Sequence, residues 1–174
     1  MSQYPEMREM QMIEVEIHMV RIDPEIKTPI VILREKGGNS RRILPIWVGF
    51  FEALAIMAEL EKHPVARPMT HDLLKSVIDS VGAEVVSVLV SDLKDTTFYA
   101  EISIRLGNGK VVKVDSRPSD AMALALRAKV PIYVAEEIMT GSGISPDVIE
   151  SDEEEQLKAI LNNLKPEDFG KYKA

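Results

Sequence analysis

The chain has 174 residues, of which 45% are hydrophobic and 28% are charged, and its formal net charge at neutral pH is −7. This balance is typical of a globular protein with a sizeable buried core, and the excess of acid argues against a passive nucleic-acid coat, which needs a basic face. Since cysteine is absent, disulfides and thiolate zinc sites are excluded, and an all-histidine metal site would need all 3 histidines.

The N-terminus and the composition predict the setting in which the protein works. The first residues are mixed and charged, unlike a secretory signal, and no apolar run approaches the ~18 residues of a membrane span. We therefore expect a soluble, cytoplasmic protein with no membrane partner. Glu and Lys are plentiful whereas Gln and Asn are scarce, a usage that favours a thermophilic source.

The first half of the chain reads as three strands followed by a helix. The strand segments, with alternating or β-branched residues, span 12–22, 28–36 and 41–49, and a Gly-rich turn lies at 37–40. Residues 50–62 carry apolar side chains at helical spacing among Ala, Leu, Met and Glu, which favour helices.

A further helix is predicted at 71–81. Thr70 is a natural N-cap, Asp72 places an acid in the first turn, and Gly82 suits the position after the last turn. An apolar stripe along this helix consists of Leu73, Leu74, Val77, Ile78 and Val81. The pattern indicates an amphipathic helix.

The same order of elements then returns. Strands are predicted at 84–92, 96–106 and 110–116, with a tight turn at 107–109. An Ala- and Leu-rich helix follows at 119–129, and a last strand at 130–136 ends in a short turn. These elements form one domain at 1–140. The remainder, 141–174, is predicted to be an acidic segment with an amphipathic C-terminal helix at 153–164.

The two halves predict an internal duplication. The repeats span about 12–62 and 82–129, and an offset of 68 positions superimposes Glu52 on Asp120 at the start of each repeat helix. The expected fold class is α+β. A mixed β-sheet core from two strand-strand-strand-helix repeats carries helices packed on the sheet, together with the C-terminal helix.

The segment DSRPSD at 115–120 concentrates polar groups at a strand-to-helix corner. Ser119 is a candidate N-cap, Asp120 would meet the positive end of the helix dipole, and Pro118 fixes the backbone. Asp115 precedes Arg117 by two residues, so both side chains are expected on one face. Such a corner can hold an anion or a metal–phosphate pair.

The segment RPMTHD at 67–72 has a similar order of residue types, with Arg67, Thr70, His71 and Asp72. If both corners meet, their side chains suit phosphodiester hydrolysis. The predicted catalytic residues are His71, Asp72, Asp115 and Asp120. The predicted phosphate-binding residues are Arg67, Thr70, Arg117 and Ser119. Asp115, Asp120 and Glu52 or Asp72 would ligate Mg²⁺ or Mn²⁺.

The same residues also fit a purely structural interpretation. Thr70 and Ser119 would then be ordinary helix caps, and the arginines would tie loops together through ion pairs. Among the aromatic residues, Trp47 suits the core or an interface. Phe98 and Tyr99 could stack on a base, but only one of them, because adjacent strand residues face opposite ways.

The motifs RPMTHDLL and DSRPSDAMALAL, with FYAEISI between them, resemble the bifunctional nuclease domain family over about 12–140. The resemblance implies hydrolysis of both DNA and RNA by a self-associating α+β protein. It suggests a stand-alone bacterial or archaeal member, because no helical module of the kind that some members carry follows residue 140.

Two functions are therefore expected from the sequence. The first is a nuclease for DNA and RNA with low sequence specificity, assisted by Mg²⁺ or Mn²⁺. The alternative is a non-catalytic anion-binding or scaffolding homo-oligomer. A homodimer is expected in either case, because the chain starts with pliable, contact-forming methionines at Met7, Met10, Met12 and Met19.

Overall fold

The computed structural model describes residues 11–37 and 42–144. Its strands are β1 (Met12–Ile22), β2 (Pro29–Glu35), β3 (Ile43–Trp47), β4 (Glu84–Lys94), β5 (Thr97–Arg105), β6 (Val111–Ser116) and β7 (Ile132–Ala135). Its helices are α1 (Phe50–Leu60), α2 (Thr70–Ser80), α3 (Pro118–Ala128) and α4 (Glu136–Ser142). Together they form an α+β fold, as the sequence predicts.

The strands form a mixed sheet of 7 strands in the order β3-β2-β1-β7-β4-β5-β6. Each neighbouring pair is antiparallel except β4 and β7, which run parallel. The strands β1 to β3 therefore lie on one side of β7, and β4 to β6 lie on its other side. The last strand of the described residues thus joins the two halves of the sheet.

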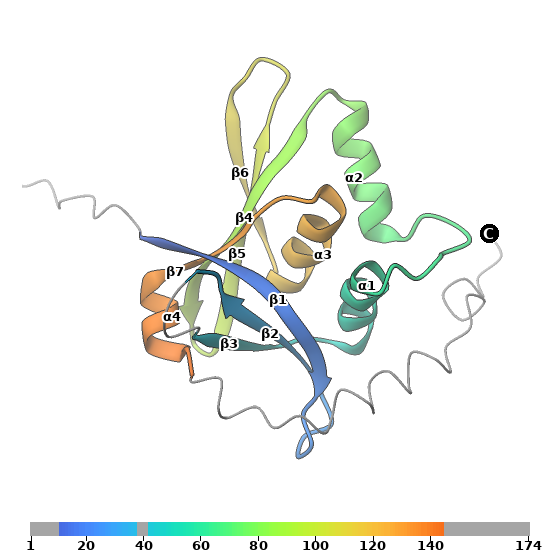
Figure 1. Cartoon of the computed structure of the whole chain (residues 1–174). Coiled ribbons are helices and arrows are strands. Elements are labelled where there is room, and N and C mark those ends of the chain that lie inside the picture. The colour runs from blue at the N-terminus through green and yellow to red at the C-terminus, as the bar shows by residue number, and fades with distance from the viewer. Residues whose placement is uncertain (1–10, 38–41, 145–174) are drawn as a thin grey trace, which may run out of the picture.

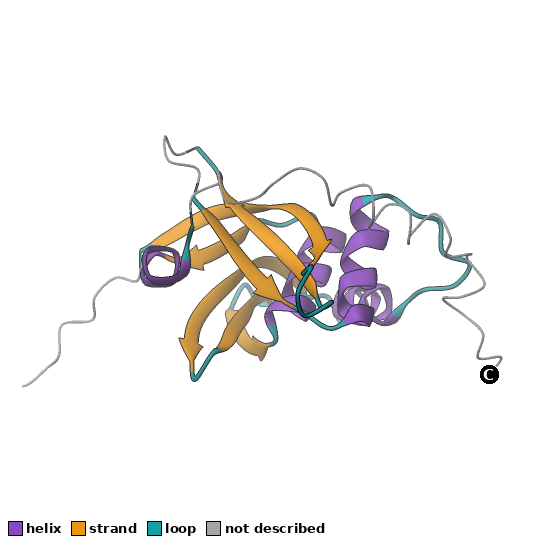
Figure 2. Cartoon of the chain, turned by 90° about the horizontal axis from the view of Figure 1, so that it is seen from below, coloured by secondary structure: helices purple, strands orange, loops and turns teal. Residues whose placement is uncertain are grey.

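Helices α1, α2 and α3 gather at one end of the curved sheet, whereas α4 lies at the other end (Figures 1 and 2). Helix α3 is central, because it contacts α1, α2, β4 and β5. The middle of α3 is buried on all sides, because its small and flexible side chains Ala121, Met122, Ala123, Leu124 and Ala125 are all at most 1% exposed. Alanine allows α1 and α2 to approach α3 closely, which brings the starts of these helices near one another.

The observed elements agree with the predicted ones to within a few residues at their ends. A difference occurs at Glu136–Ser142, where a short turn was predicted and helix α4 forms instead. Two residues after this helix, Ile144 forms a bridge with Ile43 of β3. Such tertiary contacts stabilise α4, which is too short to be stable as an isolated helix. The helix predicted at 153–164 lies outside the described residues.

Each half of the sheet has three antiparallel strands followed by a helix, β1 to β3 with α1 and β4 to β6 with α3, as a duplication would produce. The residues that cap α1 and α3, Gly49 and Arg117, are separated by the predicted offset of 68 positions. The duplication itself stays a prediction. Within the described part of the chain, no helix combines the length and the apolar character that crossing a bilayer requires.

Candidate active site

The starts of α1, α2 and α3 share one local design, an acid at the third helical position. These acids are Glu52, Asp72 and Asp120. A carboxylate at this position interacts favourably with the unpaired N–H groups of the first turn. The design places three acids where the ends of three packed helices come together.

The helix caps differ from those predicted. Met69 and Arg117 have extended backbones and cap α2 and α3, so Thr70 and Ser119 already lie inside the first turns. Pro118 explains the earlier start of α3, because proline lacks an N–H group and its fixed φ suits the first helical position. The prediction that Thr70 and Ser119 are N-caps was wrong.

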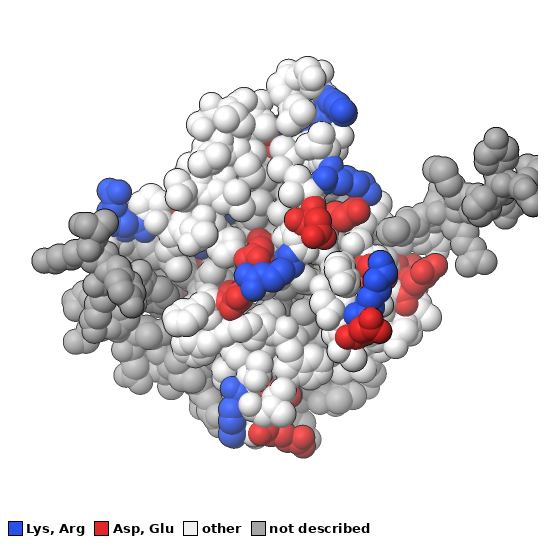
Figure 3. Space-filling model, turned by 180° about the vertical axis from the view of Figure 1, so that it is seen from behind, with Lys and Arg blue, Asp and Glu red and all other residues white. Residues whose placement is uncertain are grey.

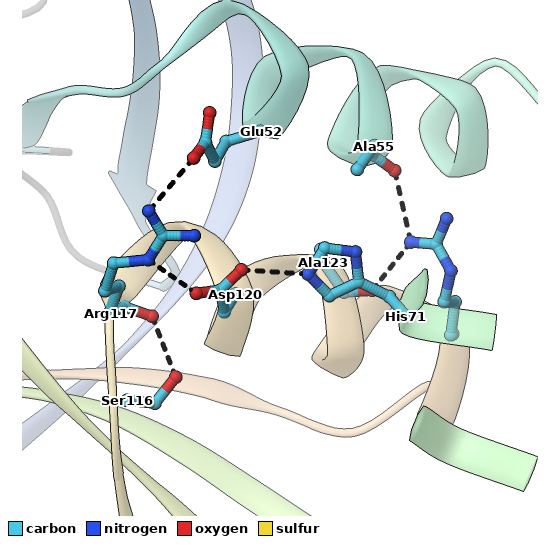
Figure 4. Close-up of polar contacts among 8 residues, drawn as sticks. Glu52, Ala55, His71, Ser116, Arg117, Asp120 and Ala123 are labelled. Atoms are coloured by element: carbon cyan, nitrogen blue, oxygen red, sulfur yellow. Dashed lines mark hydrogen bonds and ion pairs between the residues drawn. The ribbon is translucent and has the colours of Figure 1, made fainter. Parts of the chain in front are cut away.

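Arg117 joins the starts of α3 and α1 (Figure 4). Its Nε donates to Asp120 Oδ2 at 2.7 Å, and its NH1 donates to Glu52 Oε1 at 3.0 Å. The hydrogen bond to Asp120, strengthened by that carboxylate's charge, raises the pKa of Arg117. The Arg117 side chain is nevertheless 65% exposed, so one side of the guanidinium faces solvent.

His71 reaches the same acid from α2. Its Nε2 lies 3.0 Å from Asp120 Oδ1, and its side chain is only 12% exposed. Burial raises the pKa of Asp120, but hydrogen bonds with Arg117 and His71 outweigh burial, and the net pKa is lowered. Asp120 is therefore held as a carboxylate between a guanidinium and an imidazole, and the two corners meet at this residue.

Asp72 has a different partner, Arg127 in the last turn of α3. Arg127 Nε lies 2.5 Å from Asp72 Oδ1, and its NH1 donates to the carbonyls of Ala55 at 3.1 Å and Ala123 at 2.9 Å. The Arg127 side chain is 5% exposed. It ties α1, α2 and α3 together, so Asp72 serves this structural link.

Three predicted site residues make no described hydrogen bond or ion pair with Asp120. Asp115 is exposed and pairs across β6 and β5 with Glu101, whereas the alternate residues Ala100 and Ile102 face the helices. The expected shared face of Asp115 and Arg117 therefore does not form, because β6 ends between them. The other two are Arg67 and Thr70, whose side chains are exposed and to which the described residues offer no hydrogen bond or ion pair.

The acids do not form a ready-made metal site. Among residues 11–37 and 42–144, no group of three or more acid or histidine side chains is arranged to hold a metal ion. Glu52 and Asp120 do lie close to each other, but the guanidinium of Arg117 is bound between their carboxylates. The geometry of the side chains thus does not fit a preformed Mg²⁺ or Mn²⁺ site.

A hollow of about 310 Å³ opens beside Arg117. Its lining comes from three parts of the chain: Ile46, Trp47, Val48, Gly49 and Glu52, then Thr96, Thr97 and Phe98, and finally Arg117 and Ser119. The starts of α1 and α3 both contribute to this wall. Two helix N-termini and one guanidinium lie beside the same space and attract an anion, whereas the Glu52 carboxylate in the same wall opposes one.

Gly49 fixes the position of Glu52 in this wall. The Glu52 carboxylate folds back over Gly49 and leaves no room for a Cβ atom at that position. A side chain at position 49 would push the carboxylate away from Arg117. The need for glycine here is steric, because the Gly49 backbone is extended with a φ of −70°.

One face of the molecule carries mixed rather than basic charge. On the face shown in Figure 3, the Lys and Arg side chains of the described residues are scattered, several of them beside Asp or Glu, and form no continuous basic surface. Since the net charge is −7 and this face has no basic patch, an anion would have to bind through individual groups such as Arg117.

Comparison with known proteins identifies the family of the chain. Residues 31–147 match the family model of the bifunctional nuclease domain. The chain is 37% identical over 165 residues to an uncharacterized protein of Mycobacterium tuberculosis, covering 90% of this chain and 97% of that protein.

Plant proteins are also similar. Bifunctional nuclease 1 of Arabidopsis thaliana is 32% identical over 125 residues, which cover 71% of this chain and 38% of that protein. Bifunctional nuclease 2 of Oryza sativa subsp. japonica is 33% identical over 118 residues, which cover 67% of this chain and 36% of that protein. The match thus spans little more than a third of these plant proteins. The motif, the fold and these similarities together show that the chain belongs to the bifunctional nuclease domain family.

Proposed function

We propose that this protein is a nuclease that hydrolyses phosphodiester bonds of DNA and RNA with low sequence specificity. The proposal is supported by membership of the family and by the names of the plant relatives. The observation that carries it is the hollow beside Arg117, where a guanidinium, a carboxylate and two helix N-termini line one space.

Arg117 would bind the scissile phosphate. A guanidinium has five N–H donors, and the contacts with Asp120 and Glu52 use its Nε and NH1. No described residue accepts a hydrogen bond from its NH2, which remains available to a phosphate oxygen. The N–H groups at the starts of α1 and α3 would add to the stabilisation as charge builds up on the phosphorus-bound oxygens.

Glu52 would activate water. Its carboxylate lines the hollow next to Arg117 and is 23% exposed, so it is reachable from the space in which the phosphate would lie. A carboxylate in this place can accept a proton from the attacking water. Asp120 and His71 lie behind Arg117 and would hold the guanidinium in position.

Metal assistance is a separate part of the proposal. The described side chains do not form a preformed metal site. Chelation with EDTA tests the point directly. Loss of cleavage in EDTA, restored by Mn²⁺ or Mg²⁺, would support a metal that arrives with the substrate. Unchanged cleavage would assign the reaction to protein side chains alone.

The nuclease proposal is tested with purified protein on single-stranded and double-stranded DNA and RNA, with and without Mn²⁺. We expect cleavage of all four, and a loss of at least about 100-fold in rate for Glu52→Gln and Arg117→Ala. Arg105→Ala is a matched control, because Arg105 is also an exposed arginine paired with an acid, Glu84, but lies on β5 away from the hollow. Absence of cleavage under all conditions would overturn the proposal.

A second candidate function, a scaffolding homo-oligomer, is favoured by one observation on α2. Its apolar stripe is largely uncovered in the single chain, with exposures of 58% for Leu73, 39% for Leu74, 50% for Val77 and 73% for Val81. Only Ile78 of this helix is buried. A second copy of the chain would cover such a stripe.

Light scattering tests this candidate. We expect a dimer that Val77→Asp dissociates, whereas Ser76→Asp, an exposed neighbour outside the stripe, leaves the dimer intact. A wild-type protein that stays monomeric at high concentration would rule the candidate out. Self-association and cleavage are measured separately, so the two functions can be told apart.

A further inference from the structure

One side of the hollow beside Arg117 is aromatic. Trp47, at the end of β3, and Phe98, at the start of β5, both line it. Trp47 is 49% exposed, and its indole Nε1 donates to Asp23 Oδ2 at 3.1 Å. That hydrogen bond holds the ring in place before any ligand arrives. A large apolar side chain that is exposed and held in this way suits a ligand that stacks on it.

Phe98 and its neighbour Tyr99 lie in different surroundings. Phe98 is half-buried, packs against the core and lines the hollow. Tyr99 is 40% exposed and does not line the hollow, and Lys94 Nζ lies 5.4 Å from the centre of its ring. The alternation of side chains along β5 explains the difference. Phe98 is thus the member of this pair that can contact a ligand beside Arg117.

We propose that the hollow binds one unpaired nucleotide of a single-stranded nucleic acid. The phosphate would bind Arg117 and the starts of α1 and α3, and the base would stack on Trp47 and Phe98. This inference rests on the proposed nuclease function, since it specifies that the same site binds its nucleic-acid substrate as a single strand. The volume of about 310 Å³ lies at the lower end of the range for small-ligand pockets, which suits a single nucleotide unit.

Stacking explains why the site would prefer an unpaired strand to a duplex. In a duplex, both faces of each base are covered by its neighbours, so a side chain can stack only on a base that has left the helix. Stacking is tolerant of base identity, because every base has a π face. The hollow would therefore favour single strands without favouring a sequence, in agreement with the proposed low specificity.

The sequence supplies a direct probe, because Trp47 is its only tryptophan. The experiment titrates the full chain, in EDTA, with a five-nucleotide oligothymidylate that has uncleavable phosphorothioate linkages. We expect saturable quenching of the tryptophan fluorescence. A hairpin whose stem pairs the same five thymidines within a stable duplex should bind at least tenfold more weakly, and inorganic phosphate alone should leave the fluorescence unchanged.

Anisotropy of a labelled oligothymidylate measures affinity in the variants. Phe98→Leu keeps an apolar side chain in the core but removes the ring, and we expect about 5- to 100-fold weaker binding. Tyr99→Leu is the matched control, because it removes the adjacent ring on the other side of the strand, and it should bind like the wild type. Trp47→Leu should weaken binding to a similar degree as Phe98→Leu.

The outcomes separate this inference from the proposed function. Equal affinity for the duplex and the single strand, or unchanged binding in both Trp47→Leu and Phe98→Leu, would overturn it even if the protein cleaves nucleic acids. Ring-dependent binding of the single strand without any cleavage would uphold the site and overturn the nuclease proposal. Thermal unfolding of each variant verifies that the fold is retained.

Discussion

Arg117 NH1 lies 3.0 Å from Glu52 Oε1, so one ion pair joins the starts of α3 and α1 across 65 positions of the sequence. The same guanidinium holds Asp120. Two carboxylates that would repel each other are thereby kept close to a single cation. The site is arranged before substrate arrives, and this arrangement can be tested one group at a time.

Asp120→Asn removes the charge at the centre of the site but keeps the size of the side chain. We expect the cleavage rate to fall about 100-fold or more, because Arg117 and His71 lose the carboxylate that positions them. The melting temperature should change little, since the loss of partly exposed hydrogen bonds costs only about 1 kcal/mol. Initial rates and thermal unfolding are measured together. A variant that cleaves at the wild-type rate would show that Asp120 is not needed.

Gly49→Ala changes the site without touching a charged group. The added methyl group overlaps the Glu52 carboxylate, so Glu52 must turn away from Arg117. We expect cleavage to fall at least tenfold while α1 still forms, because alanine favours helices and the backbone at position 49 is extended.

A matched control for this substitution is Gly141→Ala in α4, where an added methyl group meets nothing within 4 Å. It should leave cleavage unchanged. Circular dichroism verifies the helix content of both variants. Equal rates for Gly49→Ala and the wild type would mean that the position of Glu52 does not matter.

Arg127→Met tests the link between the three helices. It removes the buried cation that pairs with Asp72 and a second hydrogen bond to each of two helix carbonyls, and we expect a loss of about 3 kcal/mol in the free energy of unfolding, most of it from the uncompensated Asp72 carboxylate. For a chain of this size, that loss lowers the melting temperature by about 6–12 °C. Arg105→Met removes an exposed ion pair and should cost less than about 1 kcal/mol. Denaturant unfolding of the two variants compares these costs.

Stability should fall in acid because of Asp72 and Asp120. Burial raises the pKa of Asp72, but hydrogen bonds from Met69 and Arg127 outweigh it, and the net pKa is below the usual 3.8. A carboxylate with a lower pKa in the folded state stabilises the fold above the usual value. That stability is lost as the pH falls through the folded-state pKa.

The acid effect is measured as the melting temperature between pH 7 and about pH 2.5. We expect little change above about pH 5 and a steep fall below pH 4. Asp72→Asn should start from a lower melting temperature and show a shallower fall. The same slope in the variant and the wild type would contradict the role of Asp72.

Local patterns predict most of the fold. The alternation of residues at 12–22 matches β1, and the apolar spacing at 50–62 matches most of α1, because these signals depend only on neighbours in the sequence. The hypothesis that two corners converge also agrees with the contact between His71 and Asp120. The similar residue order in the two corners suggested that they converge, but it did not specify which side chains would meet.

Side chains whose role depends on packing could not be predicted. Arg127 in the last turn of an apolar helix reads as an exposed cation that complements the helix dipole, yet α1 and α2 bury it. Asp115 is the opposite case. Its spacing from Arg117 suggests a shared face, but the strand ends between them and the direction of the chain changes. The burial and the direction of such side chains depend on the three-dimensional arrangement of the elements.

The position of β7 has a consequence for how the protein is made. This strand is the last of the strands in residues 11–37 and 42–144 but central in the sheet, where it is hydrogen-bonded to both β1 and β4. A nascent chain on the ribosome therefore exposes two open edges until Ile132–Ala135 have emerged. Before then, contacts between helices such as α1 and α3 can join the two halves, but the strand edges of β1 and β4 stay unpaired and open to wrong pairing.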